Sequence, residues 1–129
     1  GLYLDHTFLF LTKNPKRMQD FEFPPNAWVG TTVEDQSRLT QRLGQLRQVQ
    51  AKHFWLSVEP VLGPLDIERW GGAIDWLVIG SQTGPGATPP KREWVEDLVA
   101  QSRGHGIKVW MKNNLAAEWN GGVLRQELP

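Results

Sequence analysis

The residues with the clearest potential for chemistry are a glutamate and two lysines, each placed at the end of a short apolar run. Glu59 precedes Pro60, whose ring holds the glutamate backbone in an extended conformation. A carboxylate among apolar neighbours is desolvated unless a cation pairs with it. Two interpretations stay open: Glu59 binds a ligand, or it forms a structural ion pair with Lys13 or Lys112. Either lysine can neutralise a carboxylate or phosphate of a ligand, or simply be solvated.

A threonine and a glutamate precede the longest amphipathic segment of the chain. Thr31 and Glu34 have the spacing of a capping box, and Asp35 then falls in the favoured first turn of the helix. The same two residues also follow an apolar run, which makes them candidates for ligand binding. The sequence leaves both interpretations open.

The glycine-rich stretch from Gly80 to Gly86 matches neither the dinucleotide pattern GxGxxG nor the phosphate loop GxxxxGK[ST]. Its glycines allow backbone amides to approach a ligand closely, although a wide turn is equally compatible with them. Ligands of parallel α/β proteins bind beyond the carboxyl ends of the strands. Because the polar residues follow apolar runs, the candidate ligand-binding residues are Lys13, Thr31, Glu34, Ser57, Glu59, Gly80, Gln82, Gly84 and Lys112.

Composition excludes several kinds of site. The chain has no cysteine, so it cannot supply a disulfide, a thiol nucleophile or thiolate ligands for zinc or an iron–sulfur cluster. Its three histidines are far apart without metal-ligand spacing, and His105, between two glycines, is typical of a turn. No metal site and no Ser–His–Asp arrangement is expected. Lys plus Arg and Asp plus Glu both number 14, so charge does not indicate nucleic acid or an anionic membrane as a partner. Without an apolar run of about 18 residues or a signal-like start, we expect a cytoplasmic protein.

Five apolar segments positioned between helical patterns predict a parallel sheet. Their near-continuous apolar character is typical of strands buried on both faces, and they cover residues 6–12, 27–33, 52–58, 75–80 and 107–112. Helices are predicted from Asn14-Pro15 to Phe21, from Glu34 to Val49 and from Lys91 to Ser102, with a loop and at most one helical turn between Pro60 and Gly72. Four of the seven tryptophans fall inside predicted strands, where we expect core packing.

Strands and helices that alternate in this way predict an α/β fold, either a small open sheet or an arc of a barrel. The 129 residues fall short of the roughly 250 that a complete (β/α) barrel typically needs. The first strand, apolar from Phe8 to Leu11, would form an uncovered edge, and such an edge usually requires a partner. The chain therefore resembles a piece cut from a larger protein, or half of an assembly.

Motifs in order along the chain resemble one family. The runs are HTFLFLTKNPKRM, NAWVGTTVEDQ, FWLSVEPVLGPLD, IDWLVIGSQTGPGATP and VWMKNN, followed by LRQELP at the C-terminal end. They are similar to the phage-associated radical-S-adenosylmethionine (SAM)-like proteins of unknown function. The resemblance implies the C-terminal part of a TIM-barrel-like (β/α) partial barrel, here a single domain of residues 1–129 truncated at its N-terminus. It also implies an N-terminal three-cysteine motif that holds a [4Fe–4S] cluster in the parent protein, which this chain lacks.

The match to the family is incomplete at two positions. Gln82 stands where the family usually has an acidic residue, and Asn113 stands where a glutamine follows the last-strand lysine. By motif match the resemblance implies site roles for Lys13, Glu34, Glu59, Gln82 and Lys112.

Two function classes follow. The first is an enzyme fragment that contributes the SAM- and substrate-facing strand ends, inactive alone and completed by the missing N-terminal half of the barrel. The alternative is a non-catalytic α/β module that self-associates, as a homodimer, or binds a partner through its open sheet edge. A phosphate-binding barrel fragment is a third interpretation, against which the absence of a phosphate loop argues.

Overall fold

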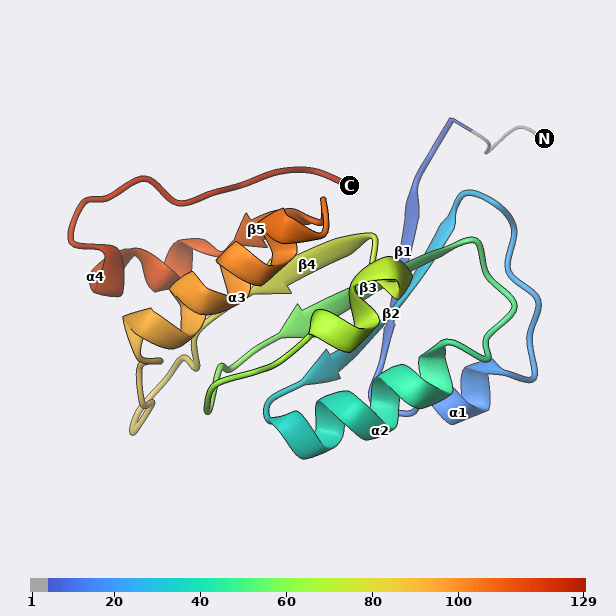
Figure 1. Cartoon of the computed structure of the whole chain (residues 1–129), viewed down its shortest axis with the longest axis horizontal. Helices are drawn as coiled ribbons and strands as arrows, with labels where there is room; N and C mark the ends of the chain where they lie inside the picture. Colours follow the sequence, from blue (N-terminus) through green and yellow to red (C-terminus); the bar gives the residue numbers. More distant parts are fainter. Residues whose placement is uncertain (1–4) are drawn as a thin grey trace.

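The computed structural model describes residues 5–129 and contains one five-stranded sheet with helices packed against it (Figure 1). The expected domain of residues 1–129 includes residues 1–4, which lie outside this described part. All neighbouring strands are parallel, and their order across the sheet equals their order along the chain. The strands are β1 (Phe8–Thr12), β2 (Ala27–Val33), β3 (His53–Val58), β4 (Trp76–Ile79) and β5 (Lys108–Met111). The α/β class and the parallel sheet are thus confirmed.

The helices connect the strands in the expected places. They are α1 (Pro15–Met18), α2 (Gln36–Leu46), the 3-10 helix η1 (Glu68–Ala73) and α3 (Arg92–Gly104), followed after β5 by η2 (Asn113–Leu115) and α4 (Ala116–Trp119). The boundaries of β2 are those predicted, and the other strands differ from the predicted ranges by one or two residues, as at β1, where pairing begins with the bond from Phe8 N to Asn26 O. The two short helices after β5 were not predicted, because elements of three and four residues carry no periodic signal.

The main hydrophobic core lies between the sheet and its helices. Residues of α2 and α3 meet one set of alternate strand residues there, and the fully buried members include Leu39, Leu43, Leu46, Val95, Leu98, Val29, Leu56, Leu77 and Ile79. Parallel strands joined to their immediate neighbours by right-handed crossovers place every crossover helix on the same face. The helices therefore cover one face of the sheet and leave the other to side chains of the strands themselves.

Tryptophans fill the helix-free face, in a cluster separate from the main core. Trp55 and Trp76 are buried there with Val78, and Trp28 and Trp110 pack against them partly buried. The expected core packing is thus confirmed for Trp55 and Trp76, in a second cluster, because each tryptophan occupies the other alternate position of its strand. The indole Nε1 of Trp55 lies 3.1 Å from both Phe10 O and Trp28 O, which ties this layer to β1 and β2.

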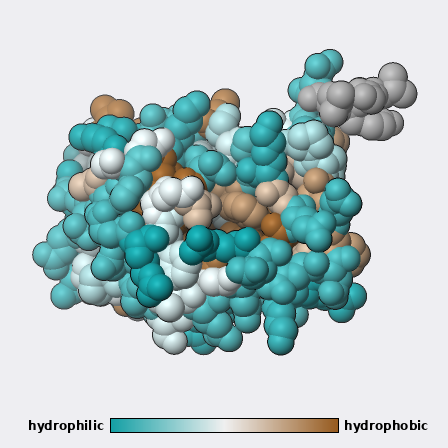
Figure 2. Space-filling model, turned by 45° about the vertical axis from the view of Figure 1, so that its right-hand side comes forward, coloured by the Kyte–Doolittle hydropathy of each residue, from teal (hydrophilic) through white to brown (hydrophobic). Residues whose placement is uncertain are grey.

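The two edges of the sheet differ. Along β5 the C-terminal segment runs antiparallel, with bonds from Met111 N to Arg125 O (2.7 Å) and from Glu127 N to Val109 O (2.8 Å). Along β1 the described part of the chain provides no further strand, and Phe8, Leu9, Phe10 and Leu11 are each 40–47% exposed. The expected open edge at β1 is therefore present, whereas the edge at β5 is covered. Figure 2 shows apolar side chains in a hollowed part of a surface that is otherwise mostly hydrophilic.

The close fit of Trp55 over Gly30 gives a first prediction. A Cβ at Gly30 would lie 2.6 Å from the Trp55 indole, whereas a Cβ at Gly44 of α2 meets nothing within 4 Å. We expect Gly30→Ala to lower the free energy of unfolding by about 1–3 kcal/mol through overpacking. The control Gly44→Ala should raise it by about 0.5–1 kcal/mol, because alanine favours a helix. Urea denaturation measures both, and equal stability of the two variants would contradict the described packing.

Candidate functional site

A hollow of about 390 Å³ lies on the helix-free face of the sheet. Its volume falls within the range of small-molecule sites, which are mostly apolar with a few convergent polar groups. The lining has this character: Leu9, Leu11, Trp55, Ser57, Glu59, Trp76, Val78, Trp110, Lys112 and Leu128. The helix-free face thus carries a wall of indole rings from Trp55, Trp76 and Trp110, called the tryptophan wall below, next to a small polar region.

Strand register explains why these residues meet. Ser57 pairs with Val78, and Val78 pairs in turn with Trp110, so the three side chains stand side by side on one face. Alternation then places Glu59 and Lys112 two residues further along β3 and β5, past the last paired residues. The polar region of the hollow therefore lies at the carboxyl ends of the strands, where ligands bind in parallel α/β proteins.

Glu59 and Lys112 form an ion pair at this end of the hollow. Lys112 Nζ lies 2.6 Å from Glu59 Oε2, and the two side chains are 43% and 28% exposed respectively. Gly80 makes room for the pair, because a Cβ there would come within 2.8 Å of the Glu59 carboxyl carbon. The pair is thus held between strand ends while both charges keep contact with solvent.

Asn114 fixes the backbone beside this ion pair. Its amide side chain accepts from Ser81 N (3.0 Å) and donates to Ser81 O (3.1 Å), and Nδ2 also lies 3.4 Å from Glu59 Oε1. One side chain from η2 therefore locks the turn after β4 and contacts the carboxylate after β3. The position of the Glu59 side chain therefore depends on residues that follow three strands, β3, β4 and β5.

Four of the nine candidate residues come together in the structure. Ser57, Glu59 and Lys112 line the hollow, and Gly80 lies beneath the Glu59 carboxylate. The proposed ion pair exists with Lys112 as the cation. Lys13 is exposed and, within residues 5–129, makes no ion pair. Glu59 and Lys112 thus form the expected structural ion pair. Ligand binding by these two residues stays a prediction.

Thr31 and Glu34 do not line the hollow. Thr31 is buried in β2 and its hydroxyl donates to Thr12 O (2.8 Å), while Glu34 lies 3.6 Å from the guanidinium groups of Arg38 and Arg42 of α2. The predicted capping box is wrong, because β2 extends through Thr31 to Val33 and leaves Asp35 as the N-cap.

Asp35 itself caps α2 in the usual way. Its Oδ1 accepts from Arg38 N at 2.9 Å, and Oδ2 lies 2.6 Å from the Arg38 guanidinium. The backbone hydrogen bond, followed by the arginine charges nearby, holds the pKa of this carboxyl below its usual range.

The other glycine-loop candidates also stay outside the hollow. Gln82 is exposed and its Oε1 accepts weakly from Thr88 N of the same loop at 3.5 Å. Gly84 and Gly86 have φ values of +97° and +75°, which other residues rarely adopt. The stretch is therefore a turn, and its positive φ values explain why Gly84 and Gly86 are glycines.

The sequence patterns did not predict the tryptophan wall or the role of Asn114. The signal for the wall was present, since Trp55, Ser57 and Glu59 alternate, as do Trp110 and Lys112, which places each tryptophan on the same face as a candidate residue. Asn114 carried no such signal, because its role depends on the turn after β4. The histidines lie elsewhere: His53 stacks on Trp28 (4.3 Å between ring centroids) and His105 pairs with Glu68 (2.6 Å). No group of three metal-ligating side chains occurs in the described residues.

The fold and the hollow define an α/β protein with a ligand-sized concavity on the uncovered face of a parallel sheet. Residues 3–122 match the model of a family described as "protein of unknown function (DUF5131)". The chain belongs to this family. Comparison with curated proteins and with solved structures found no match. Among the described residues, no helix has the length and apolar character needed to cross a membrane.

The dual role of Asn114 gives a second prediction. Asn114→Asp keeps an acceptor for Ser81 N but loses the donor to Ser81 O and places a negative charge beside Glu59. We expect the free energy of unfolding at neutral pH to fall by about 1–3 kcal/mol. Asn113→Asp, on the neighbouring exposed residue, is the control and should change it little. Thermal and urea unfolding of both variants measure the difference, and identical losses would show that position 114 has no special role.

Proposed function

We propose that this chain is the ligand-facing part of a TIM-barrel-like partial barrel in a radical-SAM-like enzyme, and that its hollow binds SAM. In this proposal the helix-free face is the inner wall of the barrel. The observation that carries it is the Glu59–Lys112 pair at the end of a tryptophan-lined hollow, on the carboxyl side of the strands.

The lining residues fit the parts of SAM. The methionine end of SAM carries one ammonium and one carboxylate, which complement Glu59 and Lys112 respectively. Indole faces stack on flat heteroaromatic rings and attract cations such as a sulfonium. Trp55, Trp76 and Trp110 supply such faces next to the ion pair. The zwitterionic amino-acid end of SAM thus complements the ion pair, and its adenine ring and sulfonium complement the indole rings.

An iron–sulfur cluster does not fit the residues of this chain. The chain contains no cysteine, so it has no thiolate ligands for a [4Fe–4S] cluster. In the proposed enzyme the cluster ligands come from a separate segment that continues the sheet beyond β1. The chain alone would then bind ligand without carrying out the reaction.

The exposed β1 edge favours a second candidate function, a non-catalytic module that acts by association. Leu9 and Leu11 are each 47% exposed and border the hollow on the uncovered edge of the sheet. An unpaired apolar edge is a template for pairing with another chain. In this function a second copy of the chain covers β1 and the tryptophan wall.

Titration calorimetry with SAM tests the first function. We expect binding that weakens by roughly tenfold or more in both Glu59→Gln and Lys112→Met, since each loses a charged hydrogen bond to the ligand. Glu96→Gln, which removes the carboxylate from the surface pair with Arg92, is the matched control and should bind as the wild type does. S-adenosylhomocysteine, which lacks the sulfonium charge, should bind more weakly than SAM.

The result that contradicts this function is equally specific. If the folded protein binds no SAM, or if Glu59→Gln and Glu96→Gln bind it equally, the ion pair has no part in a SAM site. Circular dichroism on each variant shows that the protein is folded in these measurements.

Light scattering after size-exclusion chromatography tests the second function. We expect a homodimer for the wild type that becomes a monomer in Leu9→Lys, because a lysine on an edge strand opposes strand pairing. Leu62→Lys, at a site 51% exposed outside the strands, is the control and should leave the dimer intact. A wild type that stays monomeric at high concentration would contradict self-association.

A further inference from the structure

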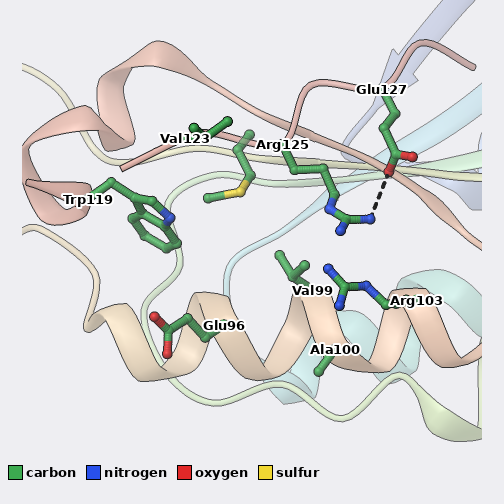
Figure 3. Close-up of a pocket in the computed structure, with 9 residues that line it drawn as sticks. Glu96, Val99, Ala100, Arg103, Trp119, Val123, Arg125 and Glu127 are labelled. Atoms are coloured by element: carbon green, nitrogen blue, oxygen red, sulfur yellow. Dashed lines mark ion pairs between the residues drawn. The ribbon is translucent and has the colours of Figure 1, made fainter. Parts of the chain in front are cut away.

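A larger hollow of about 620 Å³ lies on another part of the molecule, between α3 and the C-terminal segment (Figure 3). Its apolar lining comes from Val99 and Ala100 of α3, Met111 of β5, Trp119 of α4 and Val123. Met111 belongs to the helix-covered face of the sheet, so this hollow is separate from the tryptophan wall. It is large enough for a small organic ligand.

Two arginines point toward one another across this hollow. Figure 3 shows Arg103, from the last turn of α3, and Arg125, from the C-terminal segment, with their guanidinium groups turned into the space between the two elements. Arg125 lies 3.6 Å from Glu127, while Arg103 makes no side-chain hydrogen bond or ion pair within residues 5–129. Two like charges that converge, one of them without a partner, favour an anion between them.

The acidic groups that line the same hollow are already engaged. Glu96 pairs with Arg92 at 2.6 Å, and Glu127 accepts from Val109 N at 3.1 Å in addition to its contact with Arg125. The charges of Glu96 and Glu127 are therefore balanced by arginines, whereas Arg103 has no acidic partner among the described residues. The apolar lining beside them is only partly covered, since Val123 is 92% exposed.

We propose that this hollow binds an amphipathic organic anion, with its carboxylate or phosphate group between Arg103 and Arg125. The planar guanidinium forks match the oxygen pairs of such a group. The apolar part of the ligand lies on Val99, Ala100 and Val123. This site is independent of the function proposed for the tryptophan wall.

Titration of the purified chain with octanoate tests the proposal, with chemical-shift mapping to locate the ligand. We expect saturable binding that weakens by roughly tenfold or more in Arg103→Gln and in Arg125→Gln. The control Arg17→Gln, on the exposed surface of α1, should bind octanoate as the wild type does. Octylammonium and acetate should bind far more weakly, because each lacks one half of the recognised chemistry, and octyl phosphate run in parallel identifies the preferred head group.

Three results would overturn the proposal. The first is that the folded chain binds no octanoate. The second is that Arg103→Gln and Arg17→Gln bind octanoate equally well, and the third is that the chain binds octanoate and octylammonium equally well. Arg103→Lys provides a second variant that keeps the charge and the fold but loses the planar fork. It should bind octanoate with an affinity between those of the wild type and Arg103→Gln.

Discussion

The handedness of strand connections governs most of this structure. Each strand joins its immediate neighbour in parallel, so right-handed crossovers place α1, α2, η1 and α3 on one face of the sheet. The opposite face receives no helix and must be covered by the side chains of the strands. Tryptophan suits this position because one indole buries a large apolar area, and its N–H finds a carbonyl partner, as Trp55 and Trp76 do.

The candidate site is a consequence of the same arrangement. Large indole rings on a face without helices leave a hollow beside them, and strand alternation brings Glu59 and Lys112 to one end of it. Glycine makes room for a larger side chain at two places, since a Cβ at Gly30 would meet Trp55 and a Cβ at Gly80 would meet Glu59. Both the aromatic and the charged part of the hollow thus depend on a neighbouring glycine, Gly30 within β2 and Gly80 directly after β4.

Much of the fold could be predicted from the sequence, because buried parallel strands and amphipathic helices have strong local patterns. All five strands and the three longer connections lie where the pattern placed them, and the pair of Glu59 with Lys112 was among the expected contacts. The errors concern features that depend on tertiary structure. The cap of α2 lies at Asp35 because β2 continues through Thr31. Core packing of the strand tryptophans was predicted, but their location on the face away from the helices was not, because strands buried on both sides give no signal for which face a helix covers. The role of Asn114 depends on a turn that its own neighbours do not encode.

The two edges of the sheet differ in their capacity to pair with another strand. The antiparallel segment around Gln126 occupies the β5 side, which leaves β1 as the single strand of the described sheet with a free edge. Pairing of two chains through the same edge is isologous and uses up that edge on both partners. Self-association through the β1 edge would therefore produce a closed dimer, because neither partner would keep that edge free for a third copy.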